Sequence, residues 1–351
     1  MASVKQKLAS ALDFDKTVVI KQNGNINGVH QASKAINIKR VIPTFSVNGV
    51  YSCQLSSVSD QLAMGYGNGD VEVYNVETGE QISLIQNVCK NLPVTSIRYL
   101  YGSGAFFATG PSGKVRQIDP SQNINQWVLE LDNNEINCVD VNLDNTYLAL
   151  VGKLPYVFVY DVETFKVLTV FEGPKGIRYF SLEGSQTGHS QRLFVTKFDP
   201  VDKFTVMSAG WDSSVKLWDT RTNSVIWNVS GPKVCGEGID KSGNYLVTAS
   251  WFVKDALQLW DTRSQKLVST LNCRTVEDSE FLYCGQFYTH DKVICGGSGV
   301  TNAKLVDTVE NKVVDEVMTN LKVMQSLCLS RERKMCVTAG LGDHATCATF
   351  S

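Results

Sequence analysis

A short segment that recurs along this 351-residue chain constrains its fold more than any other feature. Each copy is an alternating run that ends in an apolar or aromatic residue followed by Asp or Asn. Successive copies are 42 to 46 residues apart, except for one interval of 58 residues. The copies are VEVYN ending at Asn75, KVRQID at Asp119, VFVYD at Asp161, VKLWD at Asp219, LQLWD at Asp261, AKLVD at Asp307 and a degraded copy, ATCATF, ending at Phe350.

Each repeat also contains the same order of expected strands. A run such as INCVDV is followed by a polar turn, NLDNT, and a second run, YLALV. A tight turn then leads into the recurring segment, which is followed by another turn and a more polar fourth run. Alternation bounded by Gly, Asn, Asp and Ser is typical of β-strands. Four strands with a period of about 40–45 residues are typical of a propeller blade. We therefore predict an all-β, single seven-bladed β-propeller.

The fourth repeat contains a recognisable set of polar residues, and with it the chain resembles the WD40-repeat family over roughly residues 36–351. The resemblance implies a hydrogen-bonded tetrad in this blade. A buried indole N–H needs an acceptor and a buried Asp needs a partner, so a structural role fits these residues better than catalysis or metal binding. The motifs are Gly188-His189, Ser208-Ala209-Gly210-Trp211-Asp212 and Trp218-Asp219, and the tetrad would be His189, Ser208, Asp212 and Trp218.

The other repeats depart from this pattern. The fifth keeps Trp260-Asp261 but has Gly231-Pro232 where Gly-His is expected. In other repeats the Trp is replaced by another residue, so apolar packing must stabilise those blades. Examples are Tyr74-Asn75, Ile118-Asp119 and Val306-Asp307.

The last repeat ends without a fourth strand. The segment AINIKRVI, residues 35–42, precedes the first repeat, and we predict that it supplies the missing strand and closes the ring. Residues 35–351 then form the propeller, with an insertion at about 172–191 between blades three and four. Residues 1–34 are an extension, in which Val4, Leu8 and Leu12 fit either a short helix or a flexible tail.

Composition limits the setting. The formal net charge of -2 gives no general attraction to nucleic acid, so no nucleic-acid partner is expected. The N-terminus lacks a signal-peptide pattern and no run is apolar enough to span a membrane. The ten scattered cysteines favour a reducing compartment. We expect a cytoplasmic protein and not a secreted one, with a nuclear or a cytoskeleton-associated location as the alternatives. The oligomeric state is not indicated.

Motifs of catalysis are absent from the sequence. It has no phosphate-binding GxxxxGK[ST] loop and no GxSxG elbow, and its four histidines show no metal-ligand spacing. No cofactor, metal or catalytic residue is therefore expected. The function predicted is a non-enzymatic scaffold or adaptor in a multiprotein assembly, such as a cytoskeletal or ciliary, ubiquitin-ligase or trafficking complex. A phospholipid- or small-molecule-binding propeller and, less favoured, an enzyme with a central-channel site are the alternatives.

Large aromatic residues in turns indicate where partner proteins could bind. Turns usually contain Gly, Asn and Asp, whereas interface hot spots are enriched in aromatic residues. Tyr66, Trp211 and Trp251 are each expected between the second and third strands of a blade. We therefore interpret them as candidate partner-binding residues, although each ring could instead pack on a neighbouring blade.

Overall fold

The alternating runs form strands throughout the part of the chain that the computed structural model describes, which is residues 36–44, 48–172, 188–273, 281–299, 302–319, 321–330 and 332–351. These ranges contain strands, turns and bends and no helix. They belong to one compact unit, Lys34–Ser351. The predicted extension 1–34 lies outside the described residues, as does most of the 172–191 insertion.

Five sheets are antiparallel meanders of four consecutive strands each. The first and second are β2 (Val50–Leu55), β3 (Gln61–Tyr66), β4 (Val71–Asn75) and β5 (Gln81–Ile85), then β6 (Ser96–Tyr99), β7 (Phe106–Thr109), β8 (Lys114–Asp119) and β9 (Ile124–Glu130). The third is β10 (Ile136–Val141), β11 (Tyr147–Gly152), β12 (Val157–Asp161) and β13 (Val167–Phe171). The fourth and fifth are β14 (Leu193–Phe198), β15 (Thr205–Gly210), β16 (Ser214–Asp219) and β17 (Ser224–Ser230), then β18 (Ile239–Ser242), β19 (Tyr245–Ala249), β20 (Leu257–Asp261) and β21 (Lys266–Thr270).

The sixth sheet has eight strands, but it consists of two meanders that one residue pair, Ser298 with Val323, joins. The sixth meander is β22 (Phe281–Phe287), β23 (Lys292–Ser298), β24 (Asn302–Asp307) and β25 (Lys312–Met318). The seventh is β26 (Val323–Ser330), β27 (Met335–Leu341), β28 (His344–Phe350) and, as its outer strand, β1 (Ile36–Pro43). Because β1 pairs antiparallel with β28 from Ile36 to Pro43, the predicted closure by an N-terminal strand is confirmed.

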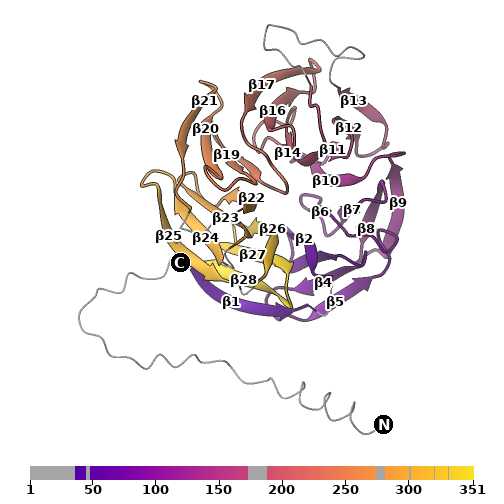
Figure 1. The fold of residues 1–351 in the computed structure, drawn as a ribbon. Coiled ribbons are helices and arrows are strands. Elements are labelled where there is room, and N and C mark those ends of the chain that lie inside the picture. Colours follow the sequence, from indigo (N-terminus) through magenta and orange to yellow (C-terminus); the bar gives the residue numbers. More distant parts are fainter. Residues whose placement is uncertain are drawn as a thin grey trace, which may run out of the picture. The chain divides into compact units, whose positions relative to one another are not determined.

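The first strands of the meanders lie around a common centre (Figure 1). Each contacts the first strand of the next meander, from β2 through β6, β10, β14, β18, β22 and β26, and β26 in turn contacts β2. The described strands thus form a closed ring, as expected for a propeller. Closure leaves each inner strand with neighbours on both sides, and only the fourth strands face outward.

The recurring Asp or Asn has a local structural role. It ends the third strand, and its side-chain oxygen accepts a backbone N–H in the turn to the fourth strand, as Asx turns require. This arrangement occurs in six meanders. The pairs are Asn75 with Glu77, Asp119 with Ser121, Asp161 with Thr164, Asp219 with Arg221, Asp261 with Arg263 and Asp307 with Val309, at 2.7–2.9 Å.

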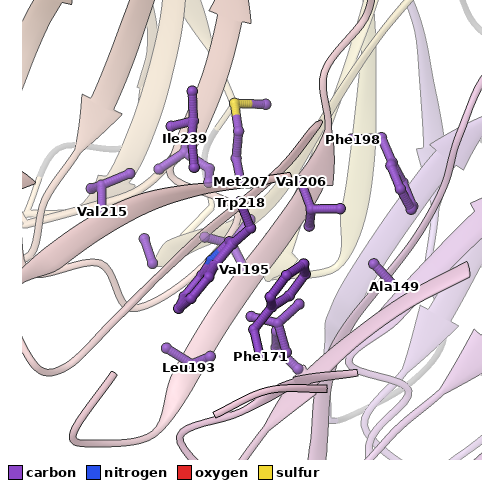
Figure 2. Close-up of a cluster of buried hydrophobic side chains, with 14 of the residues drawn as sticks. Ala149, Phe171, Leu193, Val195, Phe198, Val206, Met207, Val215, Trp218 and Ile239 are labelled. Carbon is purple, nitrogen blue, oxygen red and sulfur yellow. The ribbon is translucent and has the colours of Figure 1, made fainter. Parts of the chain in front are cut away.

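The hydrophobic core lies between neighbouring meanders. In one cluster Phe171, from β13, stacks on Trp218, from β16, with ring centroids 4.8 Å apart (Figure 2). Residues of the second and third strands are mostly buried, whereas the fourth strands are largely exposed. Packing of this kind fixes the position of each meander against the next, and it therefore fixes the loops at both ends of the ring.

Two sets of loops follow from the strand order. The turns between second and third strands share one end of the ring with the connections from each fourth strand to the next first strand, and we call this end the entry face. The turns between first and second strands and between third and fourth strands lie at the other end, the hairpin face. The three aromatic candidates belong to the entry-face end of their strands.

Candidate protein-interaction site

The four tetrad residues of the fourth meander form one hydrogen-bonded chain. The Trp218 indole N–H donates to Ser208 Oγ at 2.7 Å. Ser208 Oγ is 2.7 Å from His189 Nε2, and His189 Nδ1 is 2.7 Å from Asp212 Oδ2. Because Ser208 Oγ accepts from Trp218, its hydroxyl proton is available to His189 Nε2. The neutral imidazole with its proton on Nδ1, donating to Asp212, satisfies every group in the chain.

Burial determines the protonation of this chain. It lowers the pKa of His189 and outweighs the opposing effect of the Asp212 carboxylate. Burial alone would raise the pKa of Asp212, but hydrogen bonds from His189 and Ser214 more than offset this and lower it. The tetrad therefore contains a neutral imidazole and an ionised carboxylate at neutral pH.

The location of this hydrogen-bonded chain of four residues determines its role. The His189 and Asp212 side chains are 0% and 5% exposed, and Trp218 is buried against Phe171. Both imidazole nitrogens are already occupied by Ser208 and Asp212. A substrate or metal would have to displace one of these bonds, so the geometry is that of a structural link between the His189 loop and the turn at Asp212.

The expectation for Tyr66 is corrected by the structure. Tyr66 is only 1% exposed and packs in a core cluster with Val50 and Met64. The reason is that β3 continues through Tyr66, so the residue is paired with Val50 instead of lying in the turn. A side chain enclosed in this way does not present its ring to a partner.

Trp211 lies in the turn between β15 and β16 and is 43% exposed. Its indole N–H donates to the Cys235 sulfur at 3.0 Å, and its ring centroid is 5.1 Å from that of Phe194. Cys235 belongs to the connection into the fifth meander. The indole therefore spans the boundary between two meanders while much of its surface faces solvent.

Trp251 lies in the corresponding region after β19 and is 39% exposed. Its indole N–H donates to the Tyr283 hydroxyl at 3.2 Å, and its ring centroid is 5.0 Å from that of Phe281. Both partners belong to β22 of the sixth meander. The two tryptophans are therefore each fixed by their neighbours, and neither indole needs a hydrogen-bond acceptor from outside.

Lys233 connects the two indoles. Its Nζ is 6.0 Å from the Trp211 ring centroid and 5.7 Å from the Trp251 ring centroid, within the range of cation–π attraction. Its carbonyl also accepts the Trp251 backbone N–H at 2.8 Å. We call Trp211, Lys233 and Trp251 the tryptophan surface. Phe252 and Val253, which follow Trp251, add exposed apolar area at 38% and 46%.

Sequence reasoning missed Lys233. The residue follows Gly231-Pro232 in a connection between meanders, and nothing about its neighbours along the chain distinguishes it from any other loop lysine. Its role depends on two aromatic residues that are 22 positions before it and 18 positions after it, and only the packing of the meanders brings them together.

The centre of the ring contains a cavity of about 410 Å³ that opens toward the hairpin face. Its lining includes charged side chains that form ion pairs with one another. Arg98 Nε is 2.6 Å from Asp140 Oδ1, and Lys197 Nζ is 3.7 Å from Asp240 Oδ1. Every inner strand contributes to the lining of the cavity, which includes Gln54, Arg98, Asp140, Lys197, Asp240, Gln286 and Cys328.

The carboxylates of Asp140 and Asp240 also have backbone partners across the inner strands. Asp140 Oδ2 accepts the Phe198 N–H at 2.6 Å, and Asp240 Oδ2 accepts the Phe287 N–H at 2.8 Å. Each bond links an inner strand to the next one, so these acids stabilise the ring. Among the described residues no group of three or more His, Cys, Asp or Glu side chains could hold a metal ion. The same residues include no helix with the length and apolar character needed to cross a bilayer.

Comparisons with known proteins agree with this geometry. The family model described as WD domain, G-beta repeat, matches residues 180–219, which include the four tetrad residues. The chain is 23% identical over 303 residues to the U3 small nucleolar RNA-associated protein 21 homolog of Schizosaccharomyces pombe, an alignment that covers 82% of this chain and 30% of that protein.

Two further relatives match shorter stretches. Autophagy-related protein 16 of Arabidopsis thaliana is 26% identical over 180 residues, which are 50% of this chain and 31% of that protein. A coronin-like protein of Saccharomyces cerevisiae is 31% identical over 84 residues, covering 24% of this chain and 13% of that protein. The chain thus spans less than a third of the length of each relative.

Proposed function

Because this chain belongs to the WD40-repeat family, we propose that it is a non-enzymatic scaffold whose main partner-binding site is the tryptophan surface on the entry face. The observation behind this proposal is the pair of partly exposed indoles, each held by an internal hydrogen bond, with Lys233 between them. A rigid aromatic surface loses little conformational entropy on binding, which is why such residues dominate interface energies.

The role of scaffold also fits the rest of the described molecule. The tetrad and the channel charges are used internally, so no unpaired set of acid, base or nucleophile accompanies the tryptophan surface. The three relatives are named for three different settings, and our proposal therefore extends to the class of function and to no particular assembly. None of the ten cysteines is in a disulfide, which supports placement in a reducing compartment.

The proposal is tested with the double variant Trp211→Ala/Trp251→Ala in the full chain. Proximity labelling followed by mass spectrometry compares its partners with those of the wild type. Recovery of the principal partners should fall roughly tenfold or more, since hot-spot truncations have effects of that order. The melting temperature should change little, because both rings are partly exposed.

A matched control uses exposed residues on the hairpin face. Leu143 and Tyr245 are 49% and 41% exposed, close to the values for Trp211 and Trp251. The variant Leu143→Ala/Tyr245→Ala should retain the partners. If the tryptophan double variant keeps its fold and all of its partners, the tryptophan surface is not the binding site and the rings serve only for packing.

A further inference from the structure

Lys233 is an unusual lysine in this molecule because it has aromatic neighbours and no carboxylate. Several lysines elsewhere in the described ring have acidic partners, such as Lys203 with Asp144 at 2.8 Å and Lys241 with Asp199 at 2.5 Å. No ion pair joins Lys233 to any carboxylate of the residues that the structure describes. Its positive charge on the entry face is therefore not neutralised by a fixed negative charge.

A neighbouring acid on the same face is already engaged. Glu135, in the connection before β10, binds Arg192 at 2.5 Å and Lys153 at 3.2 Å. Arg192 and Lys153 lower the pKa of Glu135, so its carboxylate is ionised and forms ion pairs within that cluster. The cation between the indoles thus remains available to a negative group from outside.

The surface around Lys233 defines the other requirements for a ligand. The indole N–H groups are bonded to Cys235 and Tyr283, so the rings present apolar faces and need no acceptor. Phe252 and Val253 extend this apolar area. The chemistry that fits is one carboxylate flanked by apolar side chains.

A polyanion fits less well than an acidic peptide. Single-stranded nucleic acid stacks on aromatic rings, but it also needs a basic path for successive phosphates. Here the cation between the indoles has no free basic neighbour in the nearby cluster, since Arg192 and Lys153 are both paired with Glu135. A regularly charged backbone would therefore find one cation here, whereas a peptide needs only one for its carboxylate.

We propose that the tryptophan surface binds an acidic linear segment of a partner protein, with an Asp or Glu carboxylate against the Lys233 ammonium and apolar side chains against Trp211 and Trp251. This inference rests on the proposed function, and it adds the chemical class of the partner. A carboxylate placed beside a partly buried ammonium that lies near two rings gains more than one placed beside a fully exposed lysine.

The test is a displayed library of random 12-residue peptides selected on the full-length protein. Peptides enriched on the wild type should contain Asp or Glu beside Leu, Phe or Trp. A synthetic copy of the most enriched peptide should bind the Lys233→Glu variant roughly tenfold more weakly or worse. Exchanging its acidic residue for Lys should restore binding to that variant and weaken binding to the wild type.

Lys266→Glu is the matched control, because Lys266 is an exposed lysine at the hairpin-face end of β21. This variant should bind the peptide as the wild type does. A labelled 12-nucleotide oligouridylate is measured in parallel. It should bind at least tenfold more weakly than the peptide.

The outcomes separate this inference from the proposed function. Peptides that require Trp211 and Trp251 but show no acidic preference overturn the acidic partner and leave the binding site in place. Peptides whose binding survives both Trp→Ala substitutions overturn the binding site itself. Failure of any peptide to enrich, or oligouridylate binding that is tighter than the peptide's and is lost in Lys233→Glu, also overturns the acidic peptide.

Discussion

The fourth meander, β14–β17, and the seventh, β26–β28 with β1, have the same strand order but different chemistry at matching positions. Ser208 and Thr338 are each followed by Ala-Gly at the end of the second strand. Trp218 and Ala348 each pair with the residue two positions before that Ser or Thr. Ser208 bonds to both Trp218 and His189, whereas the Thr338 hydroxyl is buried without a hydrogen-bond partner in the described structure.

The difference shows two ways to secure a four-stranded unit. The fourth meander is continuous in sequence and has a saturated polar chain across its entry-face end. The seventh lacks this chain, and its core contains small thiol and apolar side chains, among them Cys328, Met335 and Cys347. Its stability depends on a strand from the other end of the sequence, since β1 covers the edge of β28. Polar chains of this kind are therefore not needed in every unit.

Removing β1 should have the largest effect, because it opens the ring at the seventh meander. Deletion of residues 1–43 removes the buried side chains of Ile36 and Ile42 as well as the β1–β28 hydrogen bonds. We expect a loss of about 5 kcal/mol or more in the free energy of unfolding. Urea denaturation followed by circular dichroism measures it.

Deletion of residues 1–34 is the comparison for that experiment, because it retains β1. This shorter deletion should unfold at nearly the same urea concentration as the full chain. If both deletions behave like the full chain, closure by β1 is dispensable and the seventh meander is stable with three strands.

Substitutions at the matching Ser and Thr should change the free energy of unfolding by different amounts. Ser208→Ala leaves the Trp218 N–H and His189 Nε2 without partners, and we expect a loss of about 3 kcal/mol. Thr338→Val removes a hydroxyl that is already unpaired, so the free energy of unfolding should stay within about 0.5 kcal/mol or rise slightly. Equal losses in the two urea titrations would show that the tetrad has no special role.

A smaller effect on the free energy of unfolding is expected from pH in the fourth meander. The pKa of His189 is lowered by burial in the folded state, whereas in the unfolded chain it is about 6.5. As pH falls below about 6.5, the unfolded chain binds a proton that folded His189 does not. The free energy of unfolding should therefore fall, by about 1.4 kcal/mol for each unit by which the pKa is lowered. Above a pH of about 6.5, His189 is neutral in both the folded and the unfolded chain, so its full contribution to the free energy of unfolding is present.

Two measurements examine this expectation. Nuclear magnetic resonance of the imidazole in the wild type should give a pKa for His189 below 6.5. Urea titrations between pH 7.5 and 5.5 should show a steeper loss for the wild type than for His189→Gln. A His189 pKa above 6.5 would mean that the effect of the Asp212 carboxylate outweighs that of burial. The assignment of a neutral imidazole to the tetrad would then be wrong.

Local pattern alone predicted much of the architecture. Alternating runs predicted the strands, and the Asp or Asn at the end of six of the third strands predicted a turn because its side chain bonds to the next backbone N–H groups. The missing fourth strand of the last repeat predicted the position of β1. Tyr66 was assigned wrongly because a one-residue extension of β3 moves its ring from a turn into the core.

The candidate site could be predicted only in part. Trp211 and Trp251 were identified because large aromatic residues are unusual in turns. Their exposure, the internal bonds of their indoles and the presence of Lys233 between them were not visible in the sequence. Each of these depends on contacts between residues of different meanders, which a single sequence does not record.

The sequence by itself determined the repeat, the all-β class and the ring closure, because strand alternation and turn chemistry act between near neighbours in the chain. Only the tertiary structure decided which side chains the ring encloses and which it leaves exposed. Three features form across boundaries between strands or meanders. They are the hydrogen bonds from Trp218 to Asp212, the paired charges of the channel and the cation between two indoles. Their chemistry is set by packing, and packing is a property of the closed ring.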